Sequence, residues 1–186
     1  MPTSDPRYLT TVADTIKNLQ PKSVLDIGVG MGKWGLLTRE YTDVWNYRFY
    51  ADEWKTKLVG LEIHPKYQTG VWEVYDEIIF GDAMDTVEKA AALSDGGFDL
   101  TIMIDVLEHF EKERGKQLID KVLRVSRHFL VSYWNSGQKD VRDNKYEDHL
   151  SQWCFKDFVP YKAKILDRGL PQFPEVCGLF LLRGCL

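Results

Sequence analysis

The stretch that decides the expected fold is Val24-Leu25-Asp26-Ile27-Gly28-Val29-Gly30-Met31-Gly32. A short apolar run carrying one acid leads into three glycines at alternate positions, and a helical pattern of apolar residues follows them. A strand, a tight glycine turn and a helix N-terminus together make a place where the backbone can approach a ligand closely. The free N–H groups at the start of such a helix favour a polar or anionic group there.

The spacing of the glycines separates this stretch from a dinucleotide-binding fingerprint. That fingerprint reads Gly-x-Gly-x-x-Gly, whereas here Gly32 comes one residue early and an acid, Asp26, stands on the strand. The pattern Asp26-x-Gly28-x-Gly30-x-Gly32 resembles motif I of the class I S-adenosylmethionine (SAM) methyltransferases. The resemblance implies SAM as the cofactor, with Asp26 facing its methionine part and the glycines making room for it. A nicotinamide dehydrogenase fits poorly, because this spacing does not suit a pyrophosphate.

Length and composition indicate an ordinary globular protein. A chain of 186 residues, 44% hydrophobic and 28% charged, predicts one domain over residues 1–186 with a sizeable core. No apolar run approaches the roughly 20 residues of a membrane helix, and the N-terminal residues lack the layout of a signal peptide. The spacing of Cys154, Cys177 and Cys185 fits no zinc or redox motif. We therefore expect a cytoplasmic protein with no membrane partner.

The charge balance bears on the class of partner. A net charge of −4 argues against a broad nucleic-acid footprint, which shows as a basic face. It does not exclude a local basic groove. A small-molecule partner is favoured, and the oligomeric state stays open.

Two further acids follow expected strands. Glu62 ends a strand predicted over residues 57–63, and a carboxylate there can accept from two vicinal hydroxyls of a ribose. In the resemblance Glu62 is the ribose ligand and Ile63 lies near the adenine. Asp82 follows a strand over residues 77–80. The resemblance implies that Asp82 binds the adenine amino group and that Ala83 offers its backbone, while the alternative for Asp82 is a helix N-cap.

The stretch Phe98–Phe110 is the second strong signal. A buried apolar strand ends in Asp105-Val106-Leu107-Glu108-His109, which resembles motif IV of the same family. Ligands of open α/β sheets bind beyond the carboxyl ends of the strands. The acids Asp26, Glu62, Asp82 and Asp105 would all stand on that edge.

The remaining pattern completes an α/β fold. Helices are expected over residues 5–20, from the glycine turn to about 41, from 82 or 85 to 93, and over 111–127; further strands are expected over 129–134, 162–166 and 175–182. A turn at Gly169-Leu170-Pro171 would join the last two strands. The resemblance then implies a three-layer, Rossmann-like, seven-stranded and mostly parallel sheet with an antiparallel last strand and helices on both faces.

Two segments are candidates for the acceptor side. The aromatic-rich stretch Asp43–Trp54 lengthens the gap between the glycine turn and the second strand. It either covers a substrate pocket, in which case it would set acceptor specificity, or packs on the outside of a helix. The polar stretch Lys139–His149 follows the fifth strand and is expected to line the substrate mouth.

Methyl transfer from a sulfonium is an in-line displacement, so the enzyme mainly aligns the nucleophile and excludes water. A protonated hydroxyl or amine also needs a general base. His149 and His109 are the candidates, since an unperturbed imidazole titrates near neutrality. His64 is expected near the adenosine without a catalytic role, and His128 is expected to be structural.

A second interpretation of the motif IV segment involves a metal. Asp105, Glu108 and His109, completed by His149, could share a divalent ion. Some methyltransferases with a similar Glu-x-x-Glu-His segment use a metal to orient the acceptor hydroxyl, including ones that act on RNA 3′ ends. Here Asp replaces Glu at the first position. The alternative is that Asp105 contacts the cofactor or acceptor while Glu108 and His109 begin the next helix.

The sequence therefore predicts a SAM-dependent methyltransferase acting on an oxygen or nitrogen of a small-molecule acceptor. One rival is a metal-assisted methyltransferase of an RNA end. Another is a SAM-binding scaffold without activity, which would show an apolar surface patch and no open cavity beside the methyl position. No Asn-Pro-Pro-Tyr or Asp-Pro-Pro-Tyr segment follows the fourth strand, which argues against methylation of an exocyclic adenine amine or a glutamine.

Overall fold

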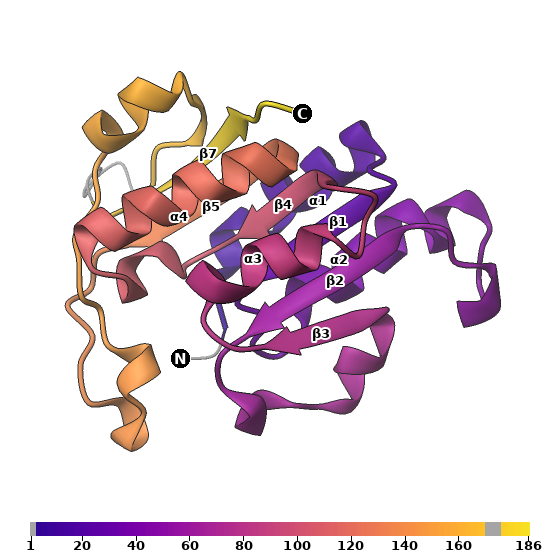
Figure 1. The fold of residues 1–186 in the computed structure, drawn as a ribbon, viewed down its shortest axis with the longest axis horizontal. Coiled ribbons are helices and arrows are strands. Elements are labelled where there is room, and N and C mark those ends of the chain that lie inside the picture. Colours follow the sequence, from indigo (N-terminus) through magenta and orange to yellow (C-terminus); the bar gives the residue numbers. More distant parts are fainter. Residues whose placement is uncertain (1–2, 170–175) are drawn as a thin grey trace.

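A computed structural model describes residues 3–169 and 176–186, and a seven-stranded sheet forms its centre (Figure 1). The strand order is β3-β2-β1-β4-β5-β7-β6. The strands are β1 (Ser23–Ile27), β2 (Lys57–Glu62), β3 (Glu77–Phe80), β4 (Phe98–Met103), β5 (Ser126–Trp134), β6 (Lys164–Asp167) and β7 (Cys177–Arg183).

The first five strands run parallel, and β7 lies antiparallel between β5 and β6. Parallel strands are buried on both faces, which is why β1, β2 and β4 have near-continuous apolar sequences. The expected mostly parallel sheet with an antiparallel last strand is confirmed. Within the predicted turn Gly169-Leu170-Pro171, Leu170 and Pro171 lie outside the described residues, as does Glu175 at the predicted start of the last strand.

Two layers of helices cover the sheet (Figure 1). Alternate residues of each strand face opposite sides: Leu25 packs with α3 (Ala83–Ala91) and α4 (Lys112–Val125), whereas Val24 packs with α1 (Leu9–Leu19) and α2 (Lys33–Thr42). The predicted helices on both faces are confirmed. None of the helices in the described ranges is long and apolar enough to span a bilayer.

A short 3-10 helix accounts for the later start of the first helix. The helix predicted from residue 5 begins as a 3-10 turn whose N-cap, Asp5, accepts from the Arg7 backbone N–H at 2.8 Å, and α1 starts only at Leu9. The 3-10 helices are η1 (Pro6–Tyr8), η2 (Val44–Asn46), η3 (Ala51–Glu53), η4 (Pro65–Tyr67), η5 (Gly70–Val74), η6 (Leu107–His109), η7 (Val141–Asp143), η8 (Lys145–Glu147) and η9 (Phe155–Tyr161).

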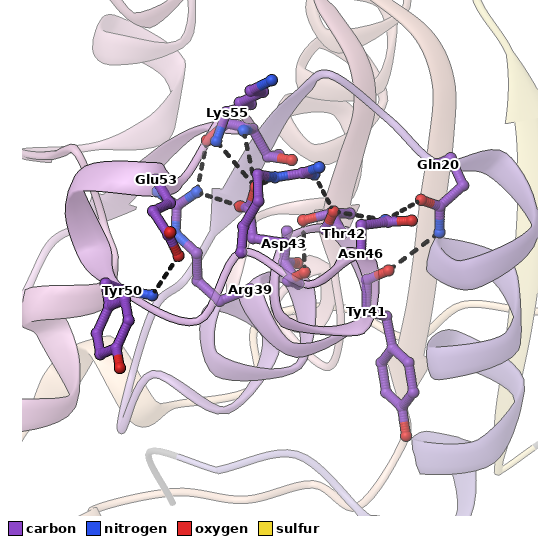
Figure 2. A network of polar contacts seen from close by, with 12 residues as sticks. Gln20, Arg39, Tyr41, Thr42, Asp43, Asn46, Tyr50, Glu53 and Lys55 are labelled. Carbon is purple, nitrogen blue, oxygen red and sulfur yellow. Dashed lines mark hydrogen bonds and ion pairs between the residues drawn. The ribbon is translucent and has the colours of Figure 1, made fainter.

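The aromatic segment Asp43–Trp54 lies away from the carboxyl ends of the strands, beyond the amino end of β2 (Figure 1). Figure 2 shows why it folds there: Asp43, fully buried, accepts from the Arg39 guanidinium (2.8 Å), the Arg48 side chain (2.8 Å) and the Lys55 backbone N–H (2.8 Å). The polar network ties the segment to the end of α2.

The prediction that this segment covers a substrate pocket is therefore wrong. Its Trp45 ring instead lies 4.3 Å from Lys17 Nζ of α1, and Tyr47 and Phe49 are exposed. A buried carboxylate with charged and backbone donors decided the position, and the aromatic composition that suggested a pocket did not.

Candidate functional site at the carboxyl edge of the sheet

A cavity of about 420 Å³ opens at the carboxyl edge of the sheet. Its wall is formed by the turn after β1, the ends of β2, β3 and β4, the polar segment after β5, and residues Thr3 and Ser4 near the N-terminus. Of the predicted site residues, those that line it are Gly28, Gly30, Glu62, Ile63, Asp82, Ala83, Asp105 and His109. Asp26, Gly32 and His149 lie outside the lining.

The glycine turn brings backbone against the cavity. Gly28 has a φ of +81°, and a Cβ there would stand 2.5 Å from a methyl group of Val106. Gly32, with a φ of +85°, forms the N-cap of α2, and its missing Cβ makes room for Val71. The turn thus needs glycine for two reasons, a left-handed backbone and close packing. The prediction that Gly32 makes room for a ligand is wrong, since its neighbour is protein.

Glu62 lies at the end of β2 with its carboxylate held by backbone. One oxygen accepts from the Gly30 N–H at 2.8 Å and the other from the His64 N–H at 2.9 Å. Burial raises the pKa of Glu62, and these N–H groups act in the opposite direction. A carboxylate oxygen accepts more than one hydrogen bond, so Glu62 keeps acceptor capacity toward the cavity that it lines.

Asp82 serves as the N-cap of α3, as its alternative interpretation predicted. Its Oδ1 accepts from the Met84 N–H at 2.9 Å, and its Oδ2 pairs with Arg114 at 2.9 Å. Ala83 is the first residue of α3 and lines the cavity beside it. The adenine contact predicted for Asp82 and Ala83 remains a prediction that their position at the cavity permits.

Asp26 lies behind the cavity wall, and its prediction needs correction. Gly35 of α2 has no side chain, and a Cβ there would stand 2.3 Å from the Tyr75 hydroxyl oxygen, so this glycine leaves room for Tyr75 beside Asp26. The Tyr75 hydroxyl donates to Asp26 Oδ2 at 2.5 Å, and within the described residues Oδ1 has no hydrogen-bond partner. Only 1% of Asp26 is exposed, so it does not face a methionine group of a ligand in the cavity.

Burial raises the pKa of Asp26 to about 7, against the lowering effect of the Tyr75 hydroxyl. Because an unfolded Asp titrates near about 3.9, the folded state holds an extra proton between roughly pH 4 and 7. The stability that this proton contributes is lost as the pH rises through that window.

Replacing Asp26 with Asn should therefore raise the free energy of unfolding by about 2 kcal/mol or more at pH 8, since Asn needs no proton. The advantage over the natural protein should shrink toward pH 4. Urea denaturation at pH 4.5, 6 and 8 measures it. A difference that stays constant with pH would mean that Asp26 does not titrate in this range.

Asp105 follows β4 in a left-handed conformation, with a φ of +55°. Its carboxylate accepts from the Ser132 hydroxyl at 2.6 Å, and that hydroxyl in turn accepts from the Asp105 N–H at 2.8 Å. The second carboxylate oxygen accepts from the Asp5 N–H at 3.0 Å. This reciprocal pair with β5 holds Asp105 in the cavity wall, where burial raises the pKa of its carboxyl.

Glu108, His109 and His149 form a cluster beside Asp105. One ligand atom from each lies within 4.8 Å of the others, and the two imidazole centroids are 4.9 Å apart. His149 is 40 residues from His109 in the sequence. It is held beside the other two residues because the Leu150 N–H donates to the Glu108 carbonyl oxygen at 2.8 Å. Asp105 is not a member, so three of the four residues of the metal interpretation come together.

Burial and, second, the charge of Asp105 hold the pKa of Glu108 well above its usual range. Its Oε2 is buried and has no hydrogen-bond partner among the described residues. Burial also lowers the pKa of His149 to about 4, and lowers that of His109. Two neutral imidazoles and one carboxylate are a donor set that divalent ions accept, so these residues fit a metal.

Comparison with known proteins adds the fold class. No family model matches the chain, and no curated protein sequence matches it. The methyltransferase domain of bacterial CtHen1-C superposes with a TM-score of 0.63 at 15% identity, over 96% of this chain and 98% of that chain. The chain has the methyltransferase fold.

Two further solved structures support this fold. The N-terminal domain of EvdMO1, solved with S-adenosylhomocysteine (SAH) and D-fucose, gives a TM-score of 0.65 at 16% identity, over 98% of this chain and 85% of that chain. A putative O-methyltransferase from Nostoc punctiforme gives 0.60 at 16% identity, over 96% of this chain and 57% of that chain. At such identities the methyltransferase fold is what the similarity shows.

Several cavity residues carry little or no signal in the sequence. Lys33 lines the cavity, and the one sequence feature that could have indicated this is its position directly after the glycine motif. Tyr67 carried no signal, because its partners Glu147 and Asn144 lie about 80 residues further along the chain: Tyr67 donates to Glu147 and accepts from Asn144 (2.7 Å). This contact holds the polar segment after β5 at the cavity wall, and its role as a substrate mouth stays a prediction.

Proposed function

We propose that this protein transfers a methyl group from SAM to an oxygen or nitrogen of a small-molecule acceptor. The observation that carries the proposal is the cavity in which the Gly28–Gly30 turn, Glu62 and Asp82 meet at the carboxyl edge of a methyltransferase-fold sheet. The presence of SAH and D-fucose in the EvdMO1 structure supports both the cofactor and a hydroxylated acceptor.

When bound, SAM supplies a methyl group on a sulfonium that is already a good leaving group. The residues of the chain then have to bind, orient and keep out water. Glu62 offers carboxylate oxygens to a pair of hydroxyls, as proposed for the ribose. The clasp formed by Tyr67, Asn144 and Glu147 closes the polar segment over the cavity and limits the access of water.

His109 is the better placed of the two candidate bases. It lines the cavity, and its Nδ1 lies 3.0 Å from the Asp148 carbonyl oxygen, so Nδ1 donates and Nε2 is left to accept a proton. His149 contacts His109 edge-on but stands behind it. In this proposal His109 contacts the acceptor and takes its proton, while His149 acts only through its contact with His109.

Calorimetric titration of the purified protein tests the cofactor. SAM and SAH should both bind with one site per chain, and NAD should not, because the cavity offers no turn suited to a pyrophosphate. Binding of NAD alone, or of none of the three, would contradict the proposal.

The cluster of Glu108, His109 and His149 favours a second candidate, metal-assisted transfer to a hydroxyl such as that of an RNA end. The buried Glu108 Oε2 has no hydrogen-bond partner among the described residues, and a bound cation would favour the ionised form of this carboxyl. A bound divalent ion would polarise the acceptor oxygen, with these three residues as its holders.

Manganese titration monitored by electron paramagnetic resonance separates the two candidates. The metal-assisted candidate requires binding that His149→Ala weakens at least roughly 10-fold, as for other lost ligands or their close supports. His128→Ala is the matched control, because His128 lies on β5 outside the cluster. An absence of manganese binding to the natural protein would leave His109 as a base acting without metal.

The scaffold alternative has one of its two expected features. Exposed aromatic residues gather in the segment Asp43–Trp54, among them Tyr47 at 83% exposure. However, an open cavity reaches His109 at the acceptor side, and its absence was the other expected feature. The enzyme remains the proposal that the site supports best.

A further inference from the structure

The residues next to the N-terminus form part of the cavity wall. Thr3 and Ser4 line the cavity, and the chain then enters η1 at Pro6. The peptide group between Ser4 and Asp5 makes two hydrogen bonds there. Its carbonyl oxygen accepts from Lys33 Nζ at 2.6 Å, and its N–H donates to Asp105 Oδ2 at 3.0 Å. One peptide group thus bridges a cation and an anion that face the same cavity.

Lys33 and Asp105 come from different elements. Lys33 opens α2 after the glycine turn, while Asp105 follows β4 and is held by Ser132. Within the described residues, the groups that accept from Lys33 Nζ are neutral ones, the Ser4 carbonyl and, at 3.2 Å, the Ser4 hydroxyl. Lys33 and Asp105 therefore contact the same peptide group, Lys33 at its carbonyl oxygen and Asp105 at its N–H.

A cation and a carboxylate at one end of a cavity complement an α-amino acid group. The carboxylate of such a ligand matches Lys33, and its ammonium matches Asp105. The two groups are joined through one carbon atom, so they lie about as close together as the oxygen and nitrogen of a peptide group. The Ser4–Asp5 peptide therefore offers Lys33 an acceptor and Asp105 a donor, the two roles that an amino-acid zwitterion would fill.

We propose that Lys33 and Asp105 bind the amino-acid end of the cofactor, and that the Ser4–Asp5 peptide is a built-in competitor which the cofactor displaces. The proposal rests on the proposed function, since it assigns one end of the same site. In this proposal Asp105 is the acid nearest the methionine part of SAM. Asp26 does not have that role, because it is buried behind the cavity wall.

A pair of ligands tests the role of Lys33. SAH carries the amino-acid group, and 5′-methylthioadenosine is a matched ligand without it. Lys33→Met should weaken SAH binding roughly 10- to 100-fold, the effect of one lost hydrogen bond to a charged group. It should leave the affinity for methylthioadenosine within about 2-fold. Lys66→Met is the control, because Lys66 is exposed and outside the cavity lining.

The outcomes separate this proposal from the proposed function. If the natural protein binds neither ligand, the SAM proposal itself fails. If it binds both, and Lys33→Met weakens both equally or neither, the cofactor assignment stands and the assignment of Lys33 is overturned. A thermal denaturation of each variant shows whether the fold is kept.

A second pair of variants tests the competitor. Asp5 has φ −58° and ψ 137°, angles that proline adopts and that suit a residue before Pro6. Asp5→Pro removes the N–H that Asp105 accepts, while Asp5→Ala keeps it. Both lose the side-chain contacts with Arg7, so the difference between them isolates the peptide contact.

Asp5→Pro should bind SAH about 2- to 10-fold more tightly than Asp5→Ala, because less competition has to be displaced. Methylthioadenosine, which does not reach Lys33 and Asp105, should bind the two variants equally. If Asp5→Pro binds SAH equally or more weakly than Asp5→Ala, the Ser4–Asp5 peptide does not compete with the cofactor. That result would overturn the proposal that this peptide is a built-in competitor.

Discussion

Replacing Gly28 with alanine is expected to weaken SAH binding by roughly 100-fold or more. The left-handed backbone costs about 1–2 kcal/mol for a residue with a side chain. The new Cβ would also stand 2.5 Å from Val106, and such overpacking costs about 1–3 kcal/mol. A shift of the glycine turn would relieve both the backbone cost and the overpacking. That shift would also displace the part of the cavity wall that the turn forms. Calorimetry with SAH measures the loss.

Two further variants show whether the contact with Val106 is responsible for the loss of SAH affinity. Gly96 has a φ of +93°, but a Cβ added there would meet nothing within 4 Å, so Gly96→Ala carries the backbone cost without the clash. It should bind SAH normally. Adding Val106→Ala to Gly28→Ala should restore part of the affinity, because it removes the methyl group that Cβ meets. Unchanged binding by Gly28→Ala would argue against a ligand beside this turn.

The second large effect is expected at Asp43. Its replacement by alanine should lower the free energy of unfolding by about 3–5 kcal/mol, the cost of breaking a buried ion pair from one side. Arg39 would keep the carbonyls of Val74 and Thr56 and a half-exposed ion pair with Asp76 at 3.1 Å. It would lose its fully buried carboxylate partner at 2.8 Å (Figure 2). Urea denaturation at pH 7 measures the change, since partners that lower the pKa of Asp43 keep it ionised there.

An exposed pair is the control for this variant. Lys116 and Glu113 are 2.6 Å apart on the surface of α4, and Glu113→Ala should leave the free energy of unfolding nearly unchanged, because solvent screens an exposed pair. Under conditions in which Asp43→Ala stays folded, this variant should bind SAH with the affinity of the natural protein. If it binds SAH more weakly, the segment Asp43–Trp54 contributes to the cavity, which would contradict its position in the fold.

The cavity edge was predictable because its signals are local in sequence. The glycine turn, Glu62, Asp82 and Asp105 each follow an apolar strand, and parallel strands bring their carboxyl ends to one edge. The resemblance to the class I SAM methyltransferases likewise predicted helices on both faces. These features depend on neighbours within a few positions, so a single sequence contains them.

The errors occurred where long-range packing chose between alternatives. Asp26 pairs with the Tyr75 hydroxyl behind the cavity wall, in space that Gly35 of the next helix leaves free. The segment Asp43–Trp54 followed a buried carboxylate to the opposite edge. No local pattern reveals which distant group will occupy a buried position, since that depends on the register of separate strands.

The sequence by itself predicted the sheet, its helical layers and the edge where most of the candidate site residues meet, because the apolar runs and the glycine motif that carry the family resemblance are properties of the local chain. Only the tertiary structure decided which polar groups meet there. It joined His149 to Glu108 and set the Ser4–Asp5 peptide between Lys33 and Asp105. Those pairings follow from burial, which leaves each polar group to find a partner across the fold.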